Sequence, residues 1–245
     1  MLKNIMLTLK FDGSRYHGWQ IQKNSMTVQE VMERAVSAVI GEYTHVIGCG
    51  RTDAGVHAKG FVCNFKADTD IPGDRFKYAL NSRLPDDIVC IASKEVSAGF
   101  HSKSSCIKKT YSYYICDGEF PDIFNHSWHY PHRLDIEKIN KAAAAFLGEH
   151  DFIGFAASGF TVKTTVRTIY ALSAVREKET VRIDVTGNGF LYNMVRIIAG
   201  TLAFAGSGRI NPEDMEEIIA SCDRTRAGMT APADGLFLSE VYYEE

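Results

Sequence analysis

The chain has 245 residues, of which 45% are hydrophobic and 23% are charged, a composition typical of a folded globular protein. This length suffices for one large domain or two small ones, and no apolar run approaches the ~20 residues that a membrane-spanning helix needs. The formal net charge of −3 neither indicates nor excludes a nucleic-acid partner, because charges can be gathered on one face. The N-terminal residues are typical of a strand rather than a signal peptide. The six cysteines contain no Cys-x-x-Cys pair, so we expect reduced thiols and a cytoplasmic location.

The first half of the chain is predicted to follow the order β-α-β-β-α-β. Residues 4–11 alternate between apolar and polar, which predicts a strand. Thr27-x-x-Glu30 is a capping box that opens a helix to about residue 40. The remaining predicted elements are strands near 45–49, 60–67 and 88–97, and a helix from Pro72 to about Arg83. This order is that of the ferredoxin-like split unit.

The second half is predicted to repeat that order without a visible sequence repeat. Its expected elements are a strand over 107–116, a helix near 135–147, a hairpin of 166–176 and 179–187, helices over 190–204 and from 211, and a last strand over 236–243. We therefore expect an α+β fold with two ferredoxin-like domains, 1–103 and 104–245. If their helix-free faces join into one antiparallel sheet, a concave platform and a central RNA-binding cleft result, although a fold alone does not prove function.

The most informative stretch is Gly50-Arg51-Thr52-Asp53-Ala54-Gly55-Val56-His57-Ala58, a charged loop between two predicted strands. An ordinary reading of Arg51 and Asp53 is a surface turn with an ion pair worth about 0–1 kcal/mol. The functional interpretation is a carboxylate that an arginine keeps ionised, so that it acts as a nucleophile or a base.

Two further motifs carry candidate binding residues. Alternation along the strand places Lys109, Tyr111 and Tyr113 on one face, where aromatic rings either fill a core or stack on a nucleobase. The run from Gly187 to Arg196 has the Gly-x-Gly start of a dinucleotide loop but lacks its third glycine. Because Arg196 stands among apolar neighbours, we expect it to lie near a carboxylate.

Other chemistries have little support in the sequence. The spacing His126-x-x-His129-x-x-His132 suggests a metal, but Trp128 and Pro131 interrupt any regular helix there, so we expect none. No Gly-x-Ser-x-Gly elbow and no Walker loop are present, which argues against a serine hydrolase or a nucleoside triphosphatase.

Taken together, the motifs resemble the TruA family of tRNA pseudouridine synthases over nearly the whole chain. The nonapeptide around Asp53 is similar to the family signature. The other similar segments are Phe11-Asp12-Gly13-Ser14-x-Tyr16-x-Gly18-Trp19-Gln20, Thr27-Val28-Gln29-Glu30, Lys109-x-Tyr111-x-Tyr113, Gly187 to Arg196, and Ala231-Pro232-Ala233-x-Gly235-Leu236.

The resemblance implies an isomerase that converts uridine to pseudouridine in the anticodon stem-loop of tRNAs, at tRNA positions 38, 39 and 40. It implies action as a homodimer without metal or organic cofactor. By position, Asp53 would be the catalytic carboxylate, Tyr111 would stack on the target uracil, and Arg196 would pair with Asp53. Arg51 would help to fill the space that the flipped base leaves.

Two other classes remain open from the residues: a non-catalytic RNA-binding module and a carboxylate-using hydrolase, which would need a second acid near Asp53. If RNA is the ligand, basic loop residues are candidates for phosphate contact. They are Arg15, Lys23, Lys103, Lys108, Lys109, Lys163 and Arg167.

Overall fold

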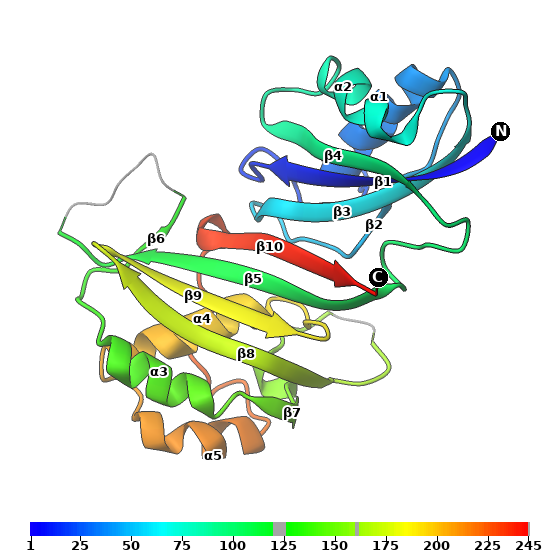
Figure 1. The fold of residues 1–245 in the computed structure, drawn as a ribbon. Helices are drawn as coiled ribbons and strands as arrows, with labels where there is room; N and C mark the ends of the chain where they lie inside the picture. The colour runs from blue at the N-terminus through cyan, green and yellow to red at the C-terminus, as the bar shows by residue number, and fades with distance from the viewer. Residues whose placement is uncertain (120–125, 160–161, 245) are drawn as a thin grey trace. The chain divides into compact units, whose positions relative to one another are not determined.

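The computed structural model describes residues 1–119, 126–159 and 162–244, and the chain forms two compact units. The first comprises Met1–Ile107 and Phe237–Glu245, and the second comprises Lys108–Leu236. Both are built from strands and helices, with five α-helices among the described residues, so the predicted α+β class is confirmed (Figure 1). Within those residues, no helix combines the length and the apolar character needed to cross a bilayer.

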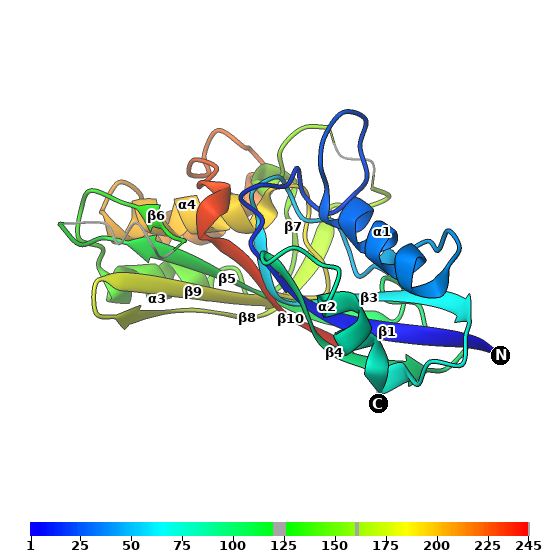
Figure 2. The ribbon, with the colours of Figure 1, turned by 90° about the horizontal axis from the view of Figure 1, so that it is seen from above.

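The first unit contains a sheet with the strand order β4-β1-β3. Its elements are β1 (Leu2–Phe11), α1 (Val28–Ile40), β2 (Ile47–Gly48), β3 (His57–Asp68), α2 (Phe76–Asn81) and β4 (Ile88–Val96). Strands β1, β3 and β4 pair antiparallel, and β2 pairs antiparallel with β3. Figure 2 shows α1 lying along one side of β1 and β3. The apolar side chains of that layer are buried, among them Leu7, Met32, Phe61, Phe65 and Phe76.

Local sequence signals fix the ends of α1. The Thr27 hydroxyl accepts a hydrogen bond from the Glu30 N–H at 3.4 Å, which confirms the predicted N-cap. Gly41 ends the helix in the left-handed conformation with φ +93°, a common way for a helix to stop.

The boundary between the two units differs from the division expected from the sequence. The amide of Asn4 donates to the carbonyls of Ser97 and Phe100, and the Ser102 N–H donates to Asn64, which anchors this segment to the first unit, within the expected range 1–103. The first unit continues to Ile107, slightly beyond that range. The last strand, β10 (Leu236–Tyr243), pairs parallel with β3 through Phe237 and Leu238. Its residues from Phe237 onward therefore belong to the first unit, whereas the sequence division assigned 104–245 to the second domain.

The second unit is a sheet with the strand order β5-β9-β8-β7. Its strands are β5 (Cys106–Cys116), β6 (Trp128–His129), β7 (Gly148–Asp151), β8 (Val166–Glu177) and β9 (Thr180–Gly187), and its helices are α3 (Ile136–Ala144), α4 (Met194–Gly206) and α5 (Met215–Ala220). The four main strands pair antiparallel, and β6 pairs parallel with the end of β5. Helix α3 packs against α4 and β8 (Figure 1). The sequence analysis did not predict the short strands β6 and β7, and it expected the helix α4 to begin at residue 190 instead of Met194.

A buried ion pair joins the end of β5 to β8 and to the segment before α3. The Asp117 carboxylate has no exposed surface and accepts two hydrogen bonds from Arg176, at 2.7 and 2.8 Å, and one from the Leu134 N–H at 2.8 Å. Burial alone would raise the pKa of Asp117, but these bonds outweigh it, and the pKa lies below its ordinary value of 3.8. This ion pair therefore stabilises the second unit in its charged form.

Candidate active site

The loop that carries Asp53 lies in the first unit, between β2 and β3. Asp53 is half-buried, Arg51 is exposed, and the intervening Thr52 is buried. Gly55 has φ +78°, a conformation that favours glycine, and the Val56 N–H donates to the Asp53 carbonyl at 3.2 Å. A tight turn therefore follows Asp53 directly.

The loop after β1 packs against the Asp53 loop through the main chain. The Trp19 N–H donates to the Thr52 carbonyl at 3.3 Å, and the Gly55 N–H donates to the Tyr16 carbonyl at 3.1 Å. A Cβ atom on Gly18 would lie 2.2 Å from the Thr52 oxygen and 3.1 Å from the Asp53 carbonyl carbon. Only glycine allows this approach, so Gly18 helps to set the position of the backbone at Asp53.

Buried aromatic and imidazole side chains pack within and beside the two loops. The Trp19 ring is buried and stacks on Phe61, with centroids 4.2 Å apart. His57 is fully buried, and its Nδ1 accepts a hydrogen bond from the Gly13 N–H at 3.0 Å. A Cβ atom on Gly13 would lie 2.0 Å from the Val56 oxygen. The carboxylate-bearing loop thus rests on packed side chains and fixed main-chain bonds.

Arg15, which the sequence made a candidate for phosphate contact, forms an ion pair with a carboxylate of the protein itself. Its Nε donates to Asp87 at 2.8 Å, and the Tyr16 hydroxyl donates to the other Asp87 oxygen at 2.7 Å. Burial and then the bond to Asp87 raise the pKa of Tyr16 to about 12. The three side chains tie the loop after β1 to the start of β4. Lys23, Lys103 and Lys163 remain exposed.

In the second unit, Tyr111 and Tyr113 have different environments although they share a strand face. Tyr111 is half-buried, and its ring meets the Phe190 ring edge-on, with centroids 5.2 Å apart and an angle of 85° between the ring planes. Tyr113 is fully buried, and its hydroxyl donates to the Pro232 carbonyl at 2.7 Å. Tyr113 therefore belongs to the core, and the hypothesis of two base-stacking tyrosines is wrong for it.

Arg196 lies in the first turn of α4, where its backbone and side chain both bind one residue of the C-terminal motif. The Ala231 N–H donates to the Arg196 carbonyl at 3.1 Å, and the Arg196 Nε donates to the Ala231 carbonyl at 2.7 Å. The Arg196 Nη1 donates to Asn193 Oδ1 at 2.8 Å. These bonds fix the direction of a guanidinium that is the only charged group in α4.

The segment before α4 is held by tertiary contacts instead of continuing the helix. Asn188 exchanges two hydrogen bonds with Thr168 of β8, at 3.0 and 3.1 Å. Phe190 packs on Tyr111, and Asn193 has φ +60°, which is not a helical value. The helix therefore begins at Met194, and the expected start at residue 190 is wrong. The sequence motif contained Asn193 but gave it no role.

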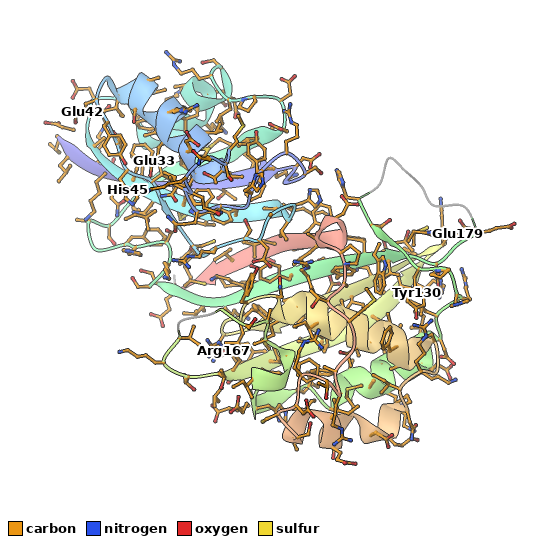
Figure 3. The ribbon with its side chains drawn as sticks, turned by 180° about the vertical axis from the view of Figure 1, so that it is seen from behind. Glu33, Glu42, His45, Tyr130, Arg167 and Glu179 are labelled. Carbon is orange, nitrogen blue, oxygen red and sulfur yellow. The ribbon has the colours of Figure 1, made fainter. Side chains whose placement is uncertain are left out.

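Arg167 lies at the start of β8, close to the same segment (Figure 3). Its Nη1 donates to the carbonyls of Thr164 and Val166, at 2.9 and 2.6 Å, and a Cβ atom on Gly189 would lie 3.5 Å from its Nε. Burial lowers the pKa of Arg167. Its cation is thus oriented by main-chain oxygens beside the loop that carries Phe190.

The three histidines with metal-like spacing have different neighbours. His126 Nδ1 lies 2.9 Å from an Asp234 oxygen, and His129 Nε2 lies 3.3 Å from the Gly118 carbonyl. His132 packs its ring against Tyr130. The three side chains therefore have different partners among the described residues.

Comparisons with known proteins place these motifs in one family. The family model for tRNA pseudouridine synthase matches residues 8–103 and 142–244. The chain belongs to the TruA family of tRNA pseudouridine synthases. It is 50% identical over 244 residues to the tRNA pseudouridine synthase A of Acetivibrio thermocellus and 46% identical over 244 residues to that of Thermoanaerobacter sp. (strain X514). Both alignments cover 99% of this chain and 100% of the relative.

Membership of this family makes the protein an isomerase that converts uridine to pseudouridine in tRNA. Among solved structures, an H/ACA RNP bound to a substrate RNA containing 2'-deoxyuridine is similar with a TM-score of 0.40 and 11% identity. That likeness covers 82% of this chain and 43% of the other, and it is too loose to bear on the site.

Proposed function

We propose that Asp53 is the catalytic carboxylate of this pseudouridine synthase and that the target uridines lie in the anticodon stem-loop of tRNA. The observation that carries the proposal is the packing of the Asp53 loop. Its main chain is fixed by the loop after β1, with two glycines at contacts that no other residue would allow. A catalytic group held in one position gains rate because little ordering is left for the transition state.

The chemistry of the reaction calls for one such group. Pseudouridine formation breaks the C–N glycosidic bond, turns the detached uracil and forms a C–C bond, with no net oxidation and no group lost. Asp53 would attack the ribose anomeric carbon, attack C6 of the uracil ring, or remove a ribose proton. In each route the carboxylate must be anionic at the start.

Arg196 is proposed to keep Asp53 in that form. Substrate binding removes water from a carboxylate, which raises its pKa, and a nearby guanidinium opposes the rise. An arginine stays charged under these conditions and can bind a carboxylate through two donors at once. The fixed orientation of Arg196 on Ala231 and Asn193 supports this role.

Tyr111 is proposed to stack on the target uracil, and Arg51 to help fill the space that the flipped base leaves. Extruding a base from its stack costs a few kcal/mol, and stacking on an aromatic ring returns about 1–3 kcal/mol. The half-buried ring of Tyr111, held edge-on by Phe190, supports the first role. The exposure of Arg51 beside Asp53 supports the second.

We further propose that each unit is a ferredoxin-like half, that the two sheets join around a central RNA-binding cleft, and that the enzyme works as a homodimer in the cytoplasm. The order β4-β1-β3 with β2 on β3, in a β-α-β-β-α-β chain, supports the first half. The absence of a Cys-x-x-Cys pair from the sequence is consistent with a reducing compartment.

The experiment is to incubate the purified protein with unmodified tRNA and to map pseudouridine by position, with Asp53→Ala as control. The proposal predicts pseudouridine in the anticodon stem-loop with the wild type and none with the variant. An unchanged product with the variant would point to another catalytic group. Cleaved tRNA would indicate a hydrolase, and binding without any chemical change would indicate an RNA-binding module.

A further inference from the structure

Asn193 precedes α4 in an unusual backbone conformation. Its φ of +60° and ψ of +6° are left-handed, and its side chain makes no capping bond to the first turn of the helix. Asparagine before a helix usually accepts from the N–H groups of that turn. Here the side chain therefore serves something other than the helix end.

The partner of the Asn193 side chain is the guanidinium of Arg196. Nη1 of Arg196 lies 2.8 Å from Asn193 Oδ1. Because a guanidinium only donates hydrogen bonds, the side-chain oxygen of Asn193 must be the atom that faces it. With the backbone left-handed, this oxygen meets the side chain of a residue three positions later. In an ordinary capping conformation, the same oxygen would accept a hydrogen bond from an N–H group of the first helical turn.

Two anchors define the plane of the guanidinium. The Nε bond to the Ala231 carbonyl fixes one edge, and the Nη1 bond to Asn193 restrains rotation of the planar group about the Cδ–Nε bond. Ala231 is itself fixed, because its N–H donates to the Arg196 carbonyl. With the Asn193 side chain removed, the guanidinium would lose the anchor on Nη1.

We propose that Asn193 is a positioning residue that orients Arg196 for its action on the Asp53 carboxylate. The inference rests on the proposed role of Arg196. It adds a residue that acts through the arginine and makes no contribution to RNA binding. Removing Asn193 Oδ1 should therefore slow the chemical step and leave tRNA affinity unchanged.

The test uses Asn193→Gly, because glycine adopts φ +60° without strain while the substitution removes the side chain that carries Oδ1. The matched control is Lys178→Gly, at an exposed left-handed residue with φ +57° in the turn between β8 and β9. Single-turnover pseudouridine formation, tRNA Kd and the thermal midpoint are measured for both. We expect Asn193→Gly to be slower by about 10- to 100-fold, because an ångström-scale misplacement of a catalytic group costs rates of that order. We expect its Kd and midpoint to match those of Lys178→Gly.

Two further variants separate this inference from the proposal on which it rests. Arg196→Ala should be slow, and Asn193→Gly/Arg196→Ala should be no slower, because Asn193 acts only through the arginine. A wild-type rate in Arg196→Ala would refute the role of Arg196 itself. A slow Arg196→Ala with a fast Asn193→Gly would overturn only the positioning role. A double variant slower than both single variants would show that Asn193 acts independently, which also overturns it.

Discussion

Replacing Gly18 by alanine tests whether the main-chain packing under Asp53 sets the rate of the reaction. The added Cβ atom would lie 2.2 Å from the Thr52 carbonyl oxygen. Because ordinary contacts between non-bonded carbon and oxygen atoms lie near or beyond about 3.4 Å, one of the two loops must retreat by about 1 Å. A displacement of that size at a catalytic group costs about 100-fold in rate.

The substitution also places a side chain at φ +78°, which costs about 1–2 kcal/mol of stability whatever the surroundings. Gly41→Ala provides the matched control, since Gly41 has φ +93° and nothing within 4 Å of an added Cβ. Both variants should lose thermal stability, by about 2–4 °C for each kcal/mol. Only Gly18→Ala should lose activity.

The assay is single-turnover pseudouridine formation at saturating enzyme, together with a thermal midpoint for each variant. A rate for Gly18→Ala within about threefold of that for Gly41→Ala would refute the argument, because it would show that a 1 Å shift of the Asp53 loop is tolerated.

Three further predictions concern binding, stacking and stability. Tyr111→Phe keeps the aromatic ring and should keep tRNA affinity, so a slower single-turnover rate would assign a proton-handling role to the hydroxyl, and an unchanged rate would leave only the ring. Arg167→Gln should reduce the slope of log affinity against log salt concentration by about 0.7–0.9 if Arg167 contacts a phosphate, and an unchanged slope would contradict that contact. Asp117→Asn should lower the free energy of unfolding by about 3 kcal/mol at pH 7, because Arg176 loses its buried partner. Since the pKa of Asp117 is depressed in the folded state, this stabilisation is present above the ordinary pKa of 3.8 and is lost as the pH falls through the folded value. Urea unfolding from pH 7 to 3 should therefore show the stabilities of the variant and the wild type converging. Stability curves that stay parallel would contradict the ion-pair account.

Features that depend on a few adjacent residues could be predicted from the sequence. The start of α1 at Thr27 follows from its own capping box, and the alternation of β1 follows from one apolar face. The family and its reaction followed from complete motifs, above all the nonapeptide around Asp53. No tertiary information was needed for these.

Features that depend on distant partners could not be predicted. The start of α4 is delayed by contacts to Thr168 and Tyr111, which lie far away in sequence. Tyr113 follows the same strand alternation as Tyr111, but the segment at Pro232 covers it. Likewise, the role of Gly18 appears only when the carbonyl of Thr52 is placed against it. In each case a residue is constrained by an atom that no local pattern contains.

The central claim is that the Asp53 carboxylate carries out the chemistry and that tRNA binding does not depend on its charge. The most direct test is single-turnover pseudouridine formation by Asp53→Asn, a substitution that keeps the shape of the side chain and removes its charge, with tRNA Kd measured on the same preparation. The account predicts no detectable pseudouridine and a Kd within about twofold of the wild type, because only the reacting group has changed. Turnover near the wild-type rate with intact binding would contradict it.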